Sequence, residues 1–240
     1  MESSLYVAVA AQRNMQKQLT VIANNIANMN TTGFRTENVD FKSIVSQQPN
    51  EDVYFPTAAK LYPSLEQGAL EPTGNPLDVA LTGSGWFSIA TPQGPAYTRD
   101  GRFQISGLGE LQTLQGFPVL DAGGSPIQLD PRSGPPDITA DGRVLLNSRL
   151  VANIGVFEVS QDQLESRFTN SAFFASSPGI PLALDGNNAV KQGFVENSNV
   201  NPIKELANLI AITKGFESAT SMIERADQSV SRAVSELGSR

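Results

Sequence analysis

The stretch that decides the fold is residues 4–30, SLYVAVAAQRNMQKQLTVIANNIANMN. Apolar side chains recur along it at alternating steps of three and four residues, which is the spacing of a heptad stripe along one face of an α-helix. The stripe positions are Leu5, Ala8, Gln12, Met15, Leu19, Ile22, Ile26 and Met29. Ser3 or Ser4 can cap the start of this helix, and Gly33 can adopt the left-handed conformation that stops it. We expect a helix from about residue 4 to about residue 30.

The same spacing returns at the other end of the chain. The stripe positions there are Leu206, Leu209, Thr213, Phe216, Thr220, Ile223, Asp227, Val230, Val234 and Leu237. Asn201 is a favoured N-cap residue, and Pro202 suits the first helical position because its missing N–H would have no intrahelical partner. Either helix alone is also compatible with ordinary amphipathic packing on its own domain. Because both ends carry a heptad stripe, we expect the helices to pair as a coiled coil with each other or with neighbouring subunits.

The middle of the chain has a different pattern, in which short apolar runs alternate with residues that favour turns. The runs are Leu77–Leu81, Trp86–Ile89, Phe103–Ile105 and Ile154–Val159. The turn signals are Thr82–Gly85, Asp100-Gly101, Gly123-Gly124, Asp141-Gly142 and Asp185-Gly186. This pattern is typical of an all-β module built from hairpins.

The predicted fold class is therefore α+β, with long terminal helices around a central β domain. We expect an N-terminal helix within residues 1–35 and an extended, partly stranded connector over residues 36–74, where four prolines occur. The β domain follows at residues 75–196, and the C-terminal helix lies within residues 197–240.

Composition excludes several classes of function. The net charge is −7, and the 17 Lys and Arg residues are scattered, so binding to nucleic acid or an anionic membrane surface is not expected. No apolar run approaches the roughly 20 residues that span a bilayer. The chain has no histidine and no cysteine, which removes Ser-His and Cys-His nucleophiles and the usual zinc sites. The first residues do not resemble a cleavable secretory signal, because an apolar stretch without a preceding Lys or Arg is soon interrupted by Gln12 and Arg13.

Carboxylate pairs are the remaining candidates for catalysis, since glycoside hydrolysis needs two well-spaced carboxyl groups. The aspartates that gather in sequence are Asp100, Asp121, Asp130, Asp137 and Asp141. Four of them lie beside Gly, Ala or Pro at predicted turns, where Asp hydrogen-bonds to its own backbone. No glycine-rich stretch matches a nucleophile elbow or a phosphate loop. We expect no catalytic residue, cofactor or metal site.

Four blocks of the sequence resemble the flagellar rod and hook proteins. Residues 23–35, ANNIANMNTTGFR, resemble the family's Asn-rich helix ending in a Thr-x-Gly-Phe turn. Residues 76–89 (PLDVALTGSGWFSI), 97–103 (YTRDGRF) and 192–201 (QGFVENSNVN) resemble three further blocks, in the same order. The motif positions are Asn24, Asn25, Ala27, Asn28, Thr32, Gly33, Phe34, Asp100, Gly101, Ser198, Asn199 and Val200. The asparagine amides are expected either to mark a fraying helix end or to hydrogen-bond across to neighbouring loops or chains.

The resemblance implies a structural, non-enzymatic subunit of the flagellar basal-body rod, located in the periplasm and exported without a cleaved signal by the flagellar type III apparatus. Its partners would be other rod proteins and copies of itself. The polymerisation interface would be the two helix stripes, without Gln12 and Asp227. Length and the Gly85-Trp86 pair favour a proximal-rod member, and a distal-rod or hook member is the alternative. A secreted module that binds or cleaves carbohydrate and has coiled ends is the alternative from a different class.

The heptad stripes lead to a prediction about the isolated chain. Helices with polar stripe positions gain little stability from propensity alone, so in dilute solution they should be digested first. Limited proteolysis, followed by mass spectrometry, should give a core of about residues 35–200. A full-length chain that resists digestion would contradict this expectation.

Overall fold

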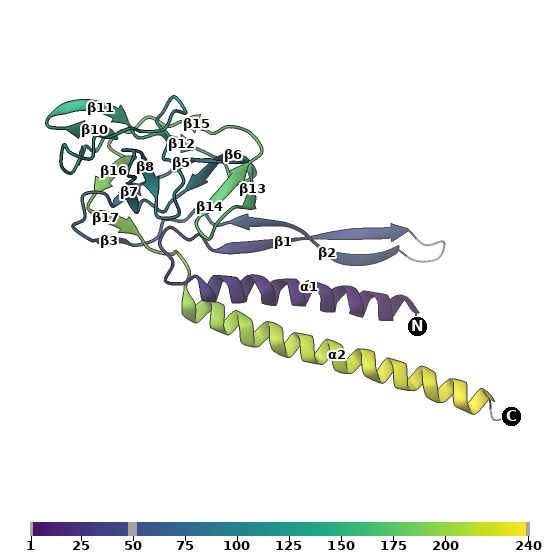
Figure 1. Cartoon of the computed structure of the whole chain (residues 1–240). Helices are drawn as coiled ribbons and strands as arrows, with labels where there is room; N and C mark the ends of the chain where they lie inside the picture. The colour runs from purple at the N-terminus through teal and green to yellow at the C-terminus, as the bar shows by residue number, and fades with distance from the viewer. Residues whose placement is uncertain (1, 48–51, 239–240) are drawn as a thin grey trace. The chain divides into compact units, whose positions relative to one another are not determined.

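The computed structural model describes residues 2–47 and 52–238, which form two compact units (Figure 1). The first unit contains two long helices, α1 (Glu2–Ala27) and α2 (Pro202–Gly238). It also contains the two-stranded sheet of β1 (Glu37–Gln47) and β2 (Asp52–Pro63), up to residue 61. The second unit comprises residues 28–36 and 62–200. Neither described helix is long and apolar enough to span a membrane.

The two helices of the first unit lie side by side and run in opposite directions (Figure 1). Between them, Gln12 donates a hydrogen bond of 3.1 Å to the hydroxyl of Thr220. Asn201 caps α2 as predicted, because its side-chain oxygen accepts hydrogen bonds from the backbone N–H groups of Ile203 and Lys204. The two predicted terminal helices are therefore confirmed, although contact within a single chain does not establish a coiled coil.

Helix α1 ends at residue 27, three residues earlier than expected. The buried Asn25 holds the following strand, since its side-chain amide donates to the carbonyl of Glu37 at 3.0 Å and its oxygen accepts the Glu37 N–H at 2.9 Å. Asn24 also donates to the carboxylate of Glu37. These amides therefore bind a neighbouring segment of the same chain, which is one of the two roles expected for them. The residues expected to form an extended connector supply β1 and β2.

The second unit contains the predicted β-rich region. Its strands are β3 (Leu70–Pro72), β4 (Val79–Thr82), β5 (Trp86–Thr91), β6 (Gly94–Thr98), β7 (Phe103–Ile105), β8 (Leu111–Thr113), β9 (Asp137–Ile138), β10 (Arg143–Leu146), β11 (Arg149–Asn153), β12 (Val156–Glu158), β13 (Leu164–Arg167), β14 (Ala172–Ala175), β15 (Ile180–Pro181), β16 (Ala189–Gln192) and β17 (Phe194–Glu196). The largest sheet has the order β13-β14-β6-β5-β12-β15, and its neighbouring strands are antiparallel. Strands β3 and β4 pair with β17 and β16, which joins the two ends of the unit.

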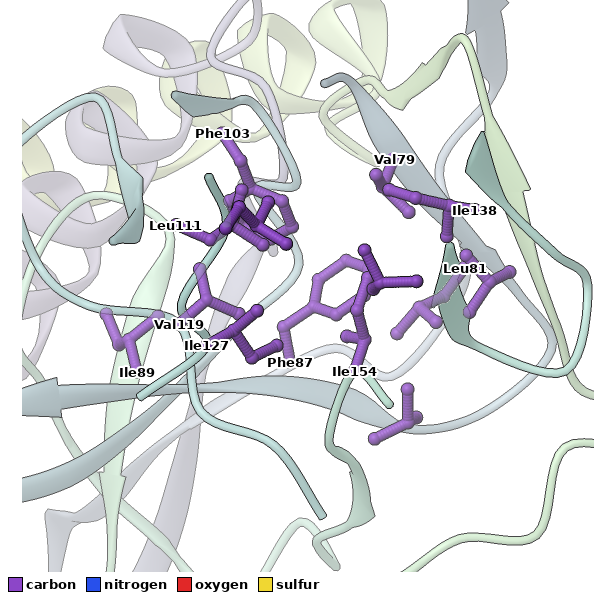
Figure 2. Close-up of a cluster of buried hydrophobic side chains, with 14 of the residues drawn as sticks. Val79, Leu81, Phe87, Ile89, Phe103, Leu111, Val119, Ile127, Ile138 and Ile154 are labelled. Carbon is purple, nitrogen blue, oxygen red and sulfur yellow. The ribbon is translucent and has the colours of Figure 1, made fainter. Parts of the chain in front are cut away.

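Strand β5 is buried on both faces of the large sheet. Its successive side chains point to opposite sides, so each face packs into a different hydrophobic cluster. Phe87 and Ile89 belong to the larger hydrophobic core, and Figure 2 shows Phe87 among its labelled neighbours. The ring of Phe87 meets Phe103 edge-on, with centroids 5.4 Å apart. Trp86 points into a second cluster, where its ring lies 5.8 Å from that of Phe173. This double burial explains why the run beginning at Trp86 is almost continuously apolar.

Only some of the predicted hairpin turns join paired strands. Asp141-Gly142 does so between β9 and β10. Asp100-Gly101 does not, because β6 pairs with β5 and β14 while β7 pairs with β8. The prediction of a hairpin there was therefore wrong. The turn between β10 and β11 was not predicted from the sequence. There Asn147 and Ser148 adopt φ values of 50° and 63°, and the turn contains no glycine.

Candidate assembly surfaces

The predicted stripes of α1 and α2 are only partly covered in the first unit. Ile22 is buried. The half-buried stripe positions are Ala8, Met15, Leu19, Ile26, Leu209, Thr213, Phe216, Thr220 and Ile223. Met29 and Leu206 differ from the expectation: Met29 follows the end of α1 and belongs to the second unit, and both side chains are exposed. The side chains of Leu5, Val230, Val234 and Leu237 lie outside those that the structure describes.

A second apolar stripe, which sequence reasoning did not separate from the first, begins α2. It consists of Ile203, Leu206 and Ile210, which are 81%, 49% and 58% exposed. Steps of three and four residues place these side chains on one face of the helix. Since large apolar groups gathered on one exposed helix face are typical of interaction surfaces, this α2 outer stripe is a candidate contact with another subunit.

The four sequence blocks converge in the second unit on a buried charge cluster formed by Arg35, Arg99 and Glu196. The carboxylate of Glu196 lies 2.7 Å from Nη2 of Arg35 and 3.1 Å from Nη1 of Arg99. The three side chains are between 1% and 3% exposed. Glu196 also accepts the backbone N–H of Gly68 at 2.9 Å, and Arg99 donates to the carbonyl of Gly83 at 2.9 Å. The contacts of Glu196 with Arg35, Gly68 and Arg99 connect segments that are 161, 128 and 97 residues apart in sequence.

The cluster carries one more positive than negative charge, and this excess shapes its electrostatics. Burial lowers the pKa of Arg99 to about 10, opposed by the Glu196 carboxylate and reinforced by the Arg35 cation. Burial also lowers the pKa of Arg35, again opposed by Glu196. Trp86 contributes a cation–π contact, with its ring centroid 5.8 Å from Cζ of Arg35 and 5.6 Å from Cζ of Arg99. Within the described residues, Nε and Nη1 of Arg35 have no hydrogen-bond partner, so Glu196 and the Trp86 ring compensate this cation only in part.

The Thr-Thr-Gly-Phe turn packs directly against the Asp-Gly block. Gly33 has φ 69°, as predicted, and a Cβ added there would lie 2.3 Å from the backbone nitrogen of Asp100. Gly101 is equally constrained, because a Cβ would lie 1.6 Å from the carbonyl oxygen of Val79. The Asp100 carboxylate forms a bidentate pair with Arg102 at 2.9 and 2.7 Å. These motif residues therefore have structural roles.

The remaining motif positions tie the turn after α1 to the segment before α2. Asn199 accepts hydrogen bonds from the N–H and the hydroxyl of Thr36, both at 2.7 Å. Phe34 is buried, and the guanidinium of Arg167 lies 4.4 Å from its ring centroid. The other motif contacts are local: Asn28 accepts from the hydroxyl of Thr31, and Ser198 accepts from the N–H of Val200. Ala27 is the last residue of α1, and Thr32 lies in the turn before Gly33.

Three of the candidate catalytic aspartates, Asp121, Asp130 and Asp141, serve turns, as expected. Asp121 accepts the N–H groups of Gly123 and Ser125, and Asp130 accepts that of Arg132. Asp141 bonds to the hydroxyl of Thr139, which lowers the pKa of this exposed carboxyl. Asp137 lies exposed in β9. In the described part of the chain, no three acidic side chains are grouped to hold a metal ion.

Every member of the charge cluster lies in one of the four sequence blocks, but the sequence does not indicate that these residues meet. Trp86, Arg99 and Glu196 each lie in a different block, and Arg35 ends the first. Arg99 directly follows β6 and Glu196 ends β17, whereas Arg35 lies in the segment between α1 and β1. These positions in sequence do not say which residues will meet, because the cluster forms by long-range contacts.

Comparison with known proteins agrees with this geometry. Family models match residues 5–35 (Flagella basal body rod protein), 80–146 (Flagellar hook protein FlgE/F/G D1 domain) and 191–236 (Flagellar basal body rod FlgEFG protein C-terminal). The chain belongs to the family of flagellar basal-body rod proteins.

Within this family the chain is similar over its full length to proteins named FlgF. It is 42% identical over 240 residues to FlgF of Mesorhizobium japonicum, covering 100% of both chains. It is 40% identical over 238 residues to FlgF of Rhizobium meliloti, covering 99% of both. FlgG of Bacillus subtilis is 31% identical over 255 residues, with 94% of this chain and 95% of that protein covered. Length and the Gly85-Trp86 pair favoured a member of the FlgF type, and the resemblance to FlgF proteins is confirmed.

The charge cluster allows a stability prediction. Glu196→Gln removes the only carboxylate of the cluster and leaves two buried guanidinium groups without compensation. Breaking a buried ion pair in this way typically costs about 3–5 kcal/mol. Urea denaturation followed by tryptophan fluorescence should report the loss, because Trp86 is the single tryptophan and contacts both arginines.

The matched control for this experiment is Glu158→Gln, which makes the same chemical change at an exposed position of the same unit. Its free energy of unfolding should stay within about 0.5 kcal/mol of that of the unchanged chain. Equal stabilities for the two variants would show that the cluster does not stabilise the second unit.

Proposed function

We propose that the chain acts in the proximal rod and polymerises through α1 and α2, so that torque passes through contacts between subunits. Family membership makes the chain a structural subunit of the flagellar basal-body rod. Its similarity to FlgF proteins along the whole chain supports the proximal position. The observation that carries the polymerisation proposal is the incomplete burial of the two helices.

Two helices packed only on each other can cover one face each. Phe216 and Ile223 of α2 remain half-buried although they belong to the packed stripe, and Ile210 of the α2 outer stripe is mostly exposed. Each square ångström of apolar surface withdrawn from water contributes roughly 25 cal/mol. Further helices from neighbouring subunits would therefore gain free energy by covering both the packed stripe and the α2 outer stripe.

The second unit supplies a different property. Its two hydrophobic clusters and the Arg35–Glu196–Arg99 cluster are formed within this one unit, so its core does not depend on another subunit. A unit with this core suits transmission of mechanical load. The proposed partners are other rod subunits and copies of the same chain.

Membership of the family also supports a proposal about how the subunit is exported and where it assembles. We propose export by the flagellar type III apparatus without a cleaved signal, and assembly in the periplasm. The alternative of a carbohydrate-cleaving module has no supporting observation among the described residues, since most of the aspartates it would need cap turns or pair with arginine.

The α2 outer stripe provides a direct test. Ile210→Asp places a charge at a position that is exposed in the single chain, so its own fold should tolerate the change, whereas a neighbouring helix packed there would not. We expect swimming in soft agar to be lost in a deletion strain complemented with this variant. We also expect the variant to be missing from purified basal bodies while its thermal unfolding midpoint is unchanged.

Ser218→Asp is the matched control, because it introduces the same side chain at an exposed polar position of the same helix. Cells carrying it should swim and should incorporate the subunit. Full motility of cells carrying Ile210→Asp would refute a subunit contact at the α2 outer stripe.

A further inference from the structure

A small polar cavity of about 110 Å³ lies within the first unit, between α1, the start of β1 and the first turns of α2. Its polar lining consists of two carboxylates and four side-chain amides. These residues are Glu37, Glu205, Gln18, Asn25, Asn38 and Asn208. The volume admits the end of one long side chain and excludes a nucleotide or a folded peptide. No cation of the described residues pairs with the carboxylate of Glu205.

Glu205 is the unusual member of this cavity. Its side chain is only 7% exposed, yet none of the described residues donates a hydrogen bond to its carboxylate. A buried charge without a partner is unfavourable. Its position in the first turn of α2 lets it complement the helix dipole, but that interaction is available to an exposed acid and does not require burial.

The basic residues of the two helices lack partners of opposite charge. All of them are exposed, and none forms an ion pair with a described residue. They are Arg13 and Lys17 on α1, and Lys204, Lys214, Arg225 and Arg232 on α2. Arg13 and Lys17 are four residues apart, so they lie one turn apart on the same face of α1. That face is opposite the stripe that packs on α2.

We propose that the cavity receives a basic side chain from α1 of a second copy of this chain, with Lys17 entering it and Arg13 beside it. The carboxylate of Glu205 would then gain its missing partner in a site already lined by amide groups. The basic face and the cavity are different surfaces, so the contact is head-to-tail and can repeat along a polymer. This inference rests on the proposed polymerisation and names the chemistry of one contact.

The first experiment separates a role in assembly from a role in folding. Glu205→Gln keeps the shape of the side chain and removes the unpartnered charge. The thermal unfolding midpoint of the isolated chain should be unchanged or higher, while incorporation into basal bodies falls at least tenfold. A lower midpoint with normal incorporation would show that Glu205 serves only the single chain and would overturn the proposal.

The second experiment is a charge exchange. Glu205→Lys should abolish swimming, because two cations would then face each other, and adding Lys17→Glu and Arg13→Glu to the same chain should restore at least half of the swimming rate. If cells carrying the exchanged chain remain immotile, the same pair of positions can be tested with the neutral changes Glu205→Gln and Lys17→Gln, singly and together. These variants measure the energetic coupling between the two positions without burying a lysine. The proposal is overturned if the two neutral changes reduce incorporation independently of each other.

Chemical cross-linking identifies the occupant. The chain has no cysteine, so two differently tagged full-length copies, one with Lys17→Cys and the other with Glu205→Cys, can be joined only at the introduced thiols. A short bismaleimide is suitable, because residues joined by a salt bridge are generally too far apart for a direct disulfide. A product carrying both tags is expected in basal bodies. The control pair Lys214→Cys with Glu205→Cys should give none.

The outcomes distinguish this contact from the proposed function. If tagged subunits are found in basal bodies but the Lys17–Glu205 product is absent or contains another rod protein, the second-copy contact is wrong and polymerisation stands. If the unsubstituted tagged chain is not found in basal bodies, the proposed function itself fails. A rise in the unfolding midpoint on adding millimolar Ca²⁺ or Mg²⁺, lost in Glu205→Gln, would make the cavity a metal site and overturn the proposal.

Discussion

The buried contact of Glu196 with Arg35 and Arg99 is the interaction on which the second unit depends. It brings together the turn that follows α1, a loop inside the β-rich region and the strand that precedes α2. Its stability is conditional, because burying three charged groups is costly and only a complete set of contacts offsets that cost. Both segments that connect to the helices are therefore anchored at one place in the second unit. The Gly33 turn and the Asn199 side chain reinforce the same anchor through backbone contacts.

The two units differ in how completely they satisfy their own side chains. The second unit forms two hydrophobic clusters and pairs the buried carboxylate of Glu196 within itself. In the first unit, half-buried stripes, an exposed α2 outer stripe and the unpaired Glu205 all remain within the single chain. This difference fits the proposed polymerisation, in which the first unit gains stability when neighbouring subunits cover it.

Local signals predicted the elements well and their pairing poorly. The helices were recognised from an uninterrupted three-and-four spacing, and the start of α2 from Asn201 and Pro202, because these signals act within one or two turns of helix. Asp100-Gly101 looked like a hairpin turn, yet its flanking strands pair elsewhere, since strand partners depend on the whole sheet. The turn at Asn147 and Ser148 was missed because it lacks the glycine that normally marks positive φ angles.

By itself, the sequence determined the two terminal helices, the β-rich middle, the absence of histidine and cysteine chemistry and the resemblance to rod proteins, because composition and periodicity are local properties of the chain. Tertiary structure alone decided that Glu196 meets two arginines, that Asn25 holds β1 against the end of α1 and that Glu205 is buried without a partner. These contacts join residues distant in sequence. Their energies depend on burial and on the direction of each side chain, and both exist only after the chain has folded.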